Sequence, residues 1–419
     1  MLFESYGIRR ELCIKDEQIM AKCHEAFMEC ERVRDVLQLR ILKAFSDHRI
    51  GVQHFAGTTG YGYGDIGRDA LDAVFAQAVG AEDALCRPQL LSGTHALTVA
   101  LFGILRTGDT LLAATGRPYD TLLPVIGLDG TGYGSLMEYG VSYDEVPLHN
   151  GEPDLEGIAE KAKNASVVHI QRSRGYESRR AFSVEDIEKI ASVSKAANPD
   201  VIVFVDNCYG EFCDVSEPIN HGADLMAGSL IKNGGGGIAP TGGYIAGRKS
   251  LVEKCAHRLT APGTGRELGS NPSGYREYYL GLFSAPSAVC EAKKSSIYAA
   301  ALFEDLGYKT VPGYTEPRND IITSLELGNP DDMITLCRAI QASSPIDSFA
   351  APIPEQMPGY ADPVIMAAGA FTSGSSIELS CDGPLREPYI AYAQGGLSLT
   401  ISRYAYLRAA QDMEDRKNG

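Results

Sequence analysis

The stretch Val201-Ile-Val-Phe-Val205 is followed directly by Asp206-Asn-Cys-Tyr-Gly-Glu211. Its unbroken run of apolar, mostly β-branched residues predicts a strand that is buried on both faces, as strands are in a parallel sheet. The carboxylate of Asp206 stands at the end of this strand. Because open α/β sheets bind ligands at the carboxyl ends of their strands, Asp206 is a candidate binding-site residue.

The segments around this strand alternate between strand-like and helical patterns. Ser166-Val-Val-His-Ile-Gln171 and Asp109-Thr-Leu-Leu-Ala-Ala114 predict two further strands. Residues 183–190 predict a helix that begins with a capping-box pattern from Ser183 to Asp186. This alternation predicts an α/β fold with a mostly parallel sheet covered by helices.

The two ends of the chain carry different patterns. Residues 11–45 place apolar side chains at helical spacing with charges between them, which predicts a helical arm. An alanine-rich helical segment at 295–306 is followed by a strand-like segment at 320–326. We therefore expect an N-terminal helical arm (1–55), a large domain (56–290) and a small α+β C-terminal domain (291–419).

Composition and charge narrow the class of protein. The chain has 419 residues, 44% hydrophobic and 22% charged, which is typical of a globular enzyme. Its net charge of -16 argues against nucleic acid and anionic membranes as partners. We found no membrane-spanning run and no signal-peptide pattern, so a cytoplasmic location is expected. The cysteines form no C-x-x-C pair and the histidines no metal-binding spacing, so no metal site is predicted.

One lysine stands between a small apolar segment and a glycine run in Asp224-Leu-Met-Ala-Gly-Ser-Leu-Ile-Lys-Asn-Gly-Gly-Gly-Gly-Ile238. Partial desolvation of Lys232 is expected to lower the pKa of its amine toward neutrality. A lysine that forms a Schiff base needs such a neutral amine. On this stretch alone, an ordinary loop lysine before a flexible turn is the alternative.

Ser92-Gly-Thr94 opens a predicted helix, so free amides and the positive end of the helix dipole can form an anion site there. A plain helix cap is the alternative. Tyr119, on a predicted strand-end loop, either stacks on a flat ligand or fills the loop. Arg172 and Arg174 suit a carboxylate or phosphate, with surface salt bridges as the alternative.

Together these parts match what pyridoxal phosphate (PLP) requires of a protein. The cofactor needs a Schiff-base lysine, an acid beside its pyridine nitrogen, an anion cradle and a face on which to stack. Lys232, Asp206, the helix start at Ser92 and the ring of Tyr119 are candidates for these roles. Ser229 can add a hydroxyl to the phosphate site.

At this point the chain resembles the bacterial aluminium-resistance / methionine gamma-lyase-like family, a branch of the fold type I PLP-dependent enzymes of cysteine and methionine metabolism. The resemblance lies in Ser92-Gly-Thr-His-Ala96, Val205-Asp-Asn-Cys-Tyr-Gly-Glu-Phe212, Ser229-Leu-Ile-Lys-Asn-Gly-Gly-Gly-Gly237 and Asp382-Gly-Pro-Leu-Arg-Glu-Pro-Tyr389. It implies an aspartate-aminotransferase-like fold. It also implies PLP on Lys232, with Asp206 at the pyridine nitrogen and Tyr119 on the ring. Phosphate contacts would come from the helix start at Gly93 and Thr94 and from Ser229.

The resemblance also implies a homo-oligomer, a tetramer or a dimer, whose sites are shared between subunits. Tyr61 matches the tyrosine that crosses from a neighbouring subunit to act beside Lys232. The better-known gamma-lyases have an arginine two residues later, where this chain has Tyr63. Their C-terminal arginine motif for the substrate carboxylate is also absent, so we expect Arg386, or as second choice Arg174, to bind that carboxylate.

The expected reaction is PLP-dependent elimination at a sulfur-containing amino acid, of the methionine gamma-lyase or cystathionine lyase type. Beta-elimination and gamma-elimination share their early steps, and the sequence does not separate them. Transamination is one alternative. A protein that binds PLP without turnover is the other.

Overall fold

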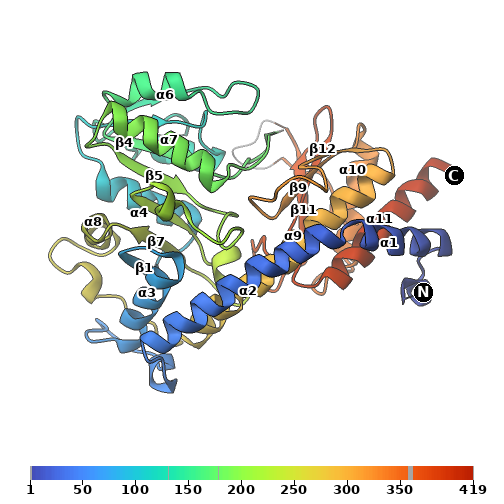
Figure 1. Cartoon of the computed structure of the whole chain (residues 1–419), viewed down its shortest axis with the longest axis horizontal. Helices are drawn as coiled ribbons and strands as arrows, with labels where there is room; N and C mark the ends of the chain where they lie inside the picture. Colours follow the sequence, from blue (N-terminus) through green and yellow to red (C-terminus); the bar gives the residue numbers. More distant parts are fainter. Residues whose placement is uncertain (1, 131, 178, 357–361, 419) are drawn as a thin grey trace. The chain divides into compact units, whose positions relative to one another are not determined.

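The computed structural model describes residues 2–130, 132–177, 179–356 and 362–418 (Figure 1). The chain forms two compact units. The sheet unit comprises Val36–Gly175 and Ala181–Ala285, and the terminal unit comprises Met1–Asp35, Tyr176–Arg180 and Pro286–Gly419. The predicted division into an arm and two domains, at residues 1–55, 56–290 and 291–419, stays a prediction.

The sheet unit is built on seven strands in the order β1-β7-β6-β5-β4-β2-β3. They are β1 (Asp83–Arg87), β2 (Thr110–Ala113), β3 (Ser142–Glu145), β4 (Val167–Gln171), β5 (Ile202–Asp206), β6 (Leu225–Ser229) and β7 (Gly243–Gly247). Strands β3, β2, β4, β5 and β6 pair in parallel, and β7 runs antiparallel to both of its neighbours. The prediction of a mostly parallel sheet is confirmed.

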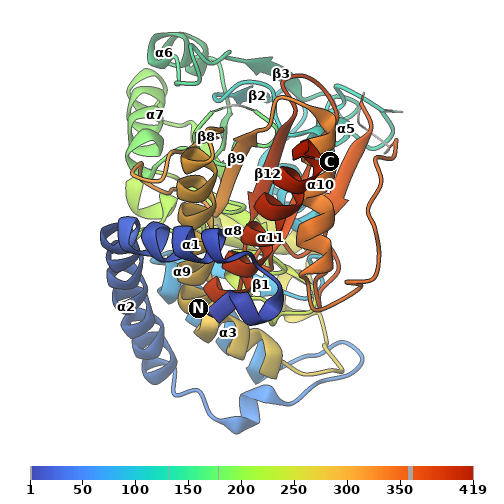
Figure 2. The ribbon, with the colours of Figure 1, turned by 90° about the vertical axis from the view of Figure 1, so that its right-hand side faces the viewer.

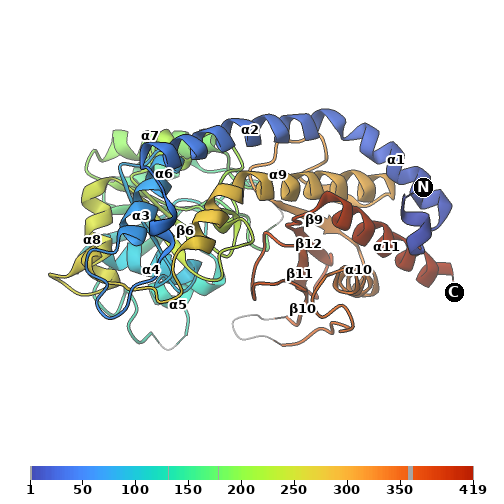
Figure 3. The same cartoon turned by 90° about the horizontal axis from the view of Figure 1, so that it is seen from below.

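Helices cover this sheet. They are α3 (Ile66–Val79), α4 (Gly93–Ile104), α5 (Leu123–Ile126), α6 (Leu155–Ala162), α7 (Val184–Ala197) and α8 (Lys249–Leu259), with short 3-10 turns η2 (Val52–Phe55), η3 (Asp120–Leu122), η4 (Pro218–His221), η5 (Asn233–Gly235) and η6 (Gly265–Glu267). In Figure 3, α6 and α7 lie on one side of β6, and α4 and α5 on the other. Helix α4 packs on β6, β7 and α8. Its apolar residues share one core with Phe204, Leu225 and Ala227 of the strands.

Two long helices contain the boundaries between the units. Helix α2 (His24–Asp47) and α1 (Arg10–Lys22) replace the single helix predicted over residues 11–45. The prediction is wrong at Cys23, a C-cap whose N–H bonds back to the carbonyls of Ile19 and Ala21. Helix α9 (Arg276–Asp305) begins well before the predicted residue 295.

The terminal unit has a five-stranded antiparallel sheet in the order β10-β11-β12-β9-β8. Its strands are β8 (Lys309–Val311), β9 (Ile322–Glu326), β10 (Val364–Ala367), β11 (Ser380–Pro384) and β12 (Ile390–Gln394), and its further helices are η1 (Leu2–Tyr6), α10 (Pro330–Ala342) and α11 (Leu399–Asn418). Figure 2 shows α10 and α11 side by side near β12. This confirms the predicted α+β C-terminal part.

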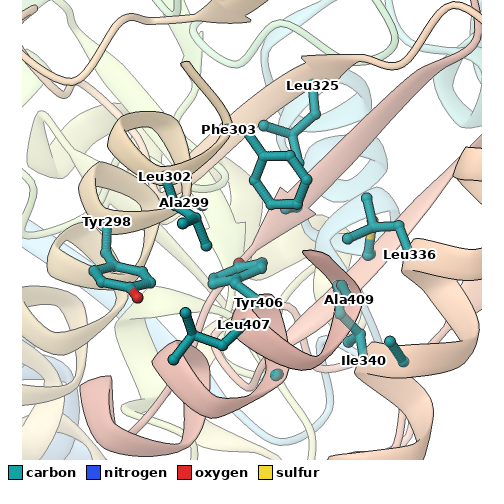
Figure 4. Close-up of a cluster of buried hydrophobic side chains, with 14 of the residues drawn as sticks. Tyr298, Ala299, Leu302, Phe303, Leu325, Leu336, Ile340, Tyr406, Leu407 and Ala409 are labelled. Atoms are coloured by element: carbon teal, nitrogen blue, oxygen red, sulfur yellow. The ribbon is translucent and has the colours of Figure 1, made fainter. Parts of the chain in front are cut away.

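One apolar core holds the terminal unit together. Figure 4 shows Phe303 of α9 between Leu325 of β9 and Tyr406 of α11, and the same cluster includes Tyr298 of α9 and Leu336 of α10. All of these side chains are buried. The core thus joins α11, near the C-terminus, to three elements that precede it in the chain, α9, β9 and α10.

Two features bear on the setting of the protein. All ten cysteines are buried free thiols. Within the described ranges, no helix is long and apolar enough to cross a membrane.

Candidate active site

The site begins where the parallel strands end. The Cα atoms of Gln171 and Asp206, the last residues of β4 and β5, are paired, and Asp206 is paired with Ala227 on β6. Paired residues of neighbouring strands point to the same face, and side chains alternate along each strand. Asp206 therefore shares a face with Gln171 and with Ser229, two residues beyond Ala227. This is the face on which α4 packs.

The start of α4 lies against the end of β6. The hydroxyl of Ser92 caps the helix by accepting the backbone N–H of His95 at 3.1 Å. Helix geometry leaves the N–H groups of Gly93 and Thr94 without acceptors inside the helix. A Cβ on Gly93 would lie 3.2 Å from Sγ of Cys208 and 3.3 Å from Cβ of Ser229. Glycine thus lets the helix start approach the strand ends, and its amides form an anion cradle.

Lys232 follows β6 at the start of η5, and two of the glycines after it stand where a side chain would clash. A Cβ on Gly235 would lie 1.8 Å from the carbonyl oxygen of Leu230. A Cβ on Gly236, which has a φ of +59, would lie 2.5 Å from the carbonyl oxygen of Gly281 on α9. The glycine run therefore allows a close approach that fixes the backbone of Lys232.

The side chain of Lys232 reaches the turn after β5. Its Nζ lies 3.9 Å from the centroid of the Tyr209 ring. Lys232 is half-buried, and Asp206 at the start of the same turn is 7% exposed. The amine and the carboxylate predicted to act together thus belong to one corner of the sheet unit.

The expectation of a lowered pKa at Lys232 is wrong for the free amine. Burial disfavours its ammonium form, but Cys208, Tyr209, Asp206 and Glu211 together raise the pKa above its usual value. Burial raises the pKa of the Cys208 thiol so far that this group stays neutral. The acidic groups around Lys232 therefore favour the ammonium form of the free amine.

Two hydrogen bonds hold the loop of Tyr119 at this site. The side-chain oxygen of Gln171 accepts the backbone N–H of Tyr119 at 2.6 Å. The hydroxyls of Thr94 and Thr121 lie 2.9 Å apart, which joins the loop to the first turn of α4. The sequence prediction did not single out Gln171. Its position as an inward-facing polar residue at the end of a buried strand was the available signal.

His169 is another residue that the sequence prediction did not select. It lies two positions before Gln171 on β4, on the same face as Asp206, and is 1% exposed. Burial lowers its pKa to about 4, and the nearby charge of Asp206 offsets only part of that shift. A neutral imidazole therefore lies next to the candidate acid.

A buried polar network supports the turn from Asn207 to Glu211. Arg172 donates to the Asn207 side chain at 2.8 Å and to the Gly210 carbonyl at 2.9 Å. Glu217 accepts from the Asn207 side chain at 2.9 Å and lies 3.8 Å from the Arg172 guanidinium. Arg172 is 1% exposed, so the alternative of a surface salt bridge does not apply to it. It holds the turn that follows Asp206.

Glu211 ends this turn and is 1% exposed. Its Oε1 accepts the hydroxyl of Tyr244 at 2.9 Å. Burial raises the pKa of the carboxyl to about 8, and the charge of Glu217 adds to the shift. Glu211 is therefore a buried group that changes charge near physiological pH.

The loop of Tyr61 is exposed at its tip and fixed at its base. Tyr61 is 70% exposed, and its ring lies 5.5 Å from that of Tyr63. The buried guanidinium of Arg68 donates to the Gly62 carbonyl at 2.8 Å. Asp65 accepts from the Thr58 hydroxyl at 2.5 Å. The loop thus presents Tyr61 outward on a firm base.

The two candidate arginines for a substrate carboxylate differ in exposure. Arg174 is fully buried. In the terminal unit, Arg386 is exposed, and its guanidinium lies 3.5 Å from the Asp362 carboxylate. Arg386 lines a pocket of about 210 Å³ together with Tyr176 and Tyr392. In exposure, Arg386 is the more accessible of the two.

The donor set fits the chemistry of PLP. The amides at the start of α4, with the hydroxyls of Ser92 and Ser229, suit a phosphate. An acid at the end of β5 and an amine after β6 suit a pyridine nitrogen and an aldehyde. The fold is that of the fold type I PLP-dependent enzymes. The PLP-dependent protein YhfS of Escherichia coli aligns over 93% of this chain and 97% of its own, with a TM-score of 0.61. Because the two sequences are only 16% identical, this likeness shows a shared fold and nothing more.

The model of the methionine gamma-lyase family matches residues 13–414, and the chain belongs to this family. YnbB of Bacillus subtilis (strain 168), named an uncharacterized protein, is 44% identical over 392 residues, which cover 93% of each chain. A structure from Clostridium novyi NT, described as a carbon-sulfur lyase involved in aluminum resistance, is 48% identical. It covers 98% of both chains with a TM-score of 0.94.

Proposed function

We propose that this chain is a PLP-dependent lyase that breaks a carbon–sulfur bond of a small amino-acid substrate. The observation that carries the proposal is the convergence of Lys232, Asp206 and the start of α4 at the carboxyl ends of the parallel strands. The family and the carbon–sulfur lyase of Clostridium novyi support the choice of reaction.

In this proposal Lys232 holds the cofactor covalently through Nζ, and Asp206 pairs with its pyridine nitrogen. The amides of Gly93 and Thr94, with the hydroxyls of Ser92 and Ser229, bind its phosphate. Tyr119 lies on its ring. Bound PLP supplies an electron-withdrawing ring that stabilises negative charge on the substrate Cα.

Lys232 also moves protons. Its free amine accepts the proton from the substrate Cα, and the resulting ammonium can donate a proton where the sulfur-bearing side chain leaves. The Asp206 carboxylate favours a positive charge on the group that it pairs with, because opposite charges at short range stabilise each other. Because the imidazole of His169 is neutral, it adds no positive charge that would offset the negative charge of Asp206.

We assign the substrate carboxylate to Arg386 rather than to Arg174. A planar guanidinium binds a carboxylate with two hydrogen bonds, but it must be reachable. Arg386 meets this condition, because its side chain is 56% exposed. If a substrate carboxylate replaced Asp362 as the partner of the Arg386 guanidinium, the guanidinium would still be paired with one negative charge.

Tyr61 acts across a subunit interface in this proposal, within a homodimer or homotetramer. Its exposed ring and the firm base of its loop suit contact with a second copy of the chain. Mixing a Tyr61→Ala chain with a Lys232→Ala chain tests the idea. If sites are shared, the mixture regains activity that neither variant has alone. We also place the protein in the cytoplasm, where buried free thiols stay reduced.

The reaction is tested by incubating the PLP-loaded protein with L-methionine, L-cystathionine and L-cysteine. Release of a thiol or sulfide with equal amounts of ammonia and a 2-oxo acid supports the lyase. The chain length of the 2-oxo acid separates beta-elimination from gamma-elimination. Formation of pyridoxamine phosphate without ammonia would identify a transaminase. No product from a broad panel of amino acids would favour a PLP-binding protein without turnover.

A further inference from the structure

Tyr209 adopts a backbone conformation that its residue type rarely takes. Its φ is +71, in the left-handed region, where glycine is free of strain and a bulky L side chain is not. The conformation is held from the lysine segment. The Asn233 side chain donates to the carbonyls of Tyr209 at 2.9 Å and of Glu211 at 3.0 Å. A tyrosine in a strained position next to a candidate site indicates that its side chain is used there.

The ring of Tyr209 faces the amine of Lys232. A distance of 3.9 Å from Nζ to the ring centroid is well within the range of about 6 Å at which a ring face attracts a cation. Both side chains are half-buried, so water competes only in part for the ammonium. The other groups that act on this amine are Asp206, Cys208 and Glu211.

We propose that Tyr209 is a positioning residue for Lys232: its ring face receives the ammonium form of the amine, restricts the long side chain to one direction and makes Lys232 a stronger base. When the amine takes a proton from the substrate Cα, it becomes the cation that the ring stabilises, and the electron pair stays on the substrate. The role in turnover rests on the proposed function. The contact between ring and amine does not.

Three substitutions separate the ring from the backbone. Tyr209→Phe keeps a ring face and removes only the hydroxyl. Tyr209→Gly removes the ring and relieves the strained backbone, so the left-handed conformation is kept without strain. Tyr209→Asn also removes the ring with a residue that tolerates the left-handed region, and it replaces Tyr209→Gly if that variant is too flexible.

The contact is measured in the full chain, freed of any cofactor, after its lysines have been methylated with ¹³C-formaldehyde and a borane. The NMR signal of Lys232 is assigned by its absence in Lys232→Arg. In the native chain and in Tyr209→Phe we expect ring-shielded methyl signals and a high titration midpoint. In Tyr209→Gly and Tyr209→Asn we expect the shielding to disappear and the midpoint to fall by about one pH unit. The exposed Lys249 serves as the control in every sample.

A Lys232 signal with no shielding in the native chain, or one that Tyr209→Gly leaves unchanged, would overturn the proposal. This outcome is independent of whether PLP binds, so it is distinct from a failure of the proposed function. In the loaded enzyme we expect kcat to fall about tenfold in Tyr209→Gly, with KM little changed and with Tyr209→Phe near the native value. If kcat fell as much in Tyr209→Phe as in Tyr209→Gly, the hydroxyl of Tyr209 and not its ring would be responsible, and the proposal would be wrong.

Discussion

The side-chain oxygen of Gln171 accepts the backbone N–H of Tyr119 at 2.6 Å, while its amide donates to the carbonyl of Ser173 at 3.2 Å. Gln171 is the last residue of β4 and is 6% exposed. A rigid strand end thus sets the position of a loop residue by one short contact. The sheet thus helps to set the backbone position of the residue that carries the candidate stacking ring.

Gln171→Leu removes both hydrogen bonds and leaves the amide of Tyr119 without its acceptor. We expect the free energy of unfolding to fall by about 1–2 kcal/mol, the usual cost of losing a buried hydrogen bond. We also expect PLP to bind about tenfold more weakly, because the ring loses its position. Gln171→Glu keeps the acceptor and is the matched control. Denaturant unfolding and an absorbance titration measure the two effects, and equal PLP affinity in both variants would contradict the role of Gln171.

Gly93→Ala tests the anion cradle. The added Cβ would lie 3.2 Å from Cys208 and 3.3 Å from Ser229, which is tighter than most such contacts and narrows the space at the helix start. We expect a loss of PLP affinity of at least about tenfold, with a stability cost near 1 kcal/mol. Gly313→Ala in the terminal unit, where the new Cβ meets only the flexible side chains of Glu304 and Glu316, is the control. Unchanged PLP binding in Gly93→Ala would place the phosphate elsewhere.

Glu211 predicts a dependence of stability on pH. Its pKa is raised from 4.5 to about 8 by burial, so the folded protein binds this proton more tightly than the unfolded chain does. Between pH 4.5 and about 8 the carboxyl of Glu211 ionises in the unfolded chain but stays protonated in the folded protein. The free energy of unfolding therefore falls as the pH rises through this range. Glu211→Gln cannot ionise. We expect it to gain about 1–3 kcal/mol relative to the native chain over this range, measured by denaturant unfolding at several pH values. A difference that does not change with pH would show that Glu211 is ionised throughout.

Arg172→Leu leaves the buried carboxylate of Glu217 without its cation, which lies 3.8 Å away in the native chain. Breaking one side of a buried ion pair costs about 3–5 kcal/mol, and we expect a loss of stability in that range. The double variant Arg172→Leu with Glu217→Gln removes the uncompensated charge and should recover part of the loss. A double-mutant cycle measures this coupling. Additive losses would mean that the two groups do not interact.

Much of the sheet unit could be predicted because its signals are local. The apolar run before Asp206 forms β5, and Ser92 caps α4 as the pattern indicates. The start of α9 could not be predicted this way. Glycine is unfavourable inside a helix, yet Gly281 lies inside α9. Only glycine fits at this position, because a Cβ there would come within 2.4 Å of the carbonyl oxygen of Gly235. The need for glycine at position 281 thus comes from a contact with a segment that is distant in the sequence.

The electrostatics of the candidate site could be predicted only in part. Lys232 stands out in the sequence, but the direction of its pKa shift depends on its burial and on the acidic groups from Asp206 to Glu211 that the fold brings to it. Arg172 reads as a loop cation, whereas its partners Asn207 and Glu217 come from the turn after the next strand. Residue types gave the candidates. Their charge states required the neighbours in space.

The central claim is that the Nζ of Lys232 carries PLP, and one measurement tests it directly. The full chain is incubated with PLP, treated with borohydride and analysed by peptide mass spectrometry and visible absorption. We predict a visible band that borohydride removes and a pyridoxyl group fixed on the peptide containing Lys232, both absent in Lys232→Ala. A pyridoxyl group on another lysine, or the same band in Lys232→Ala, would contradict the account.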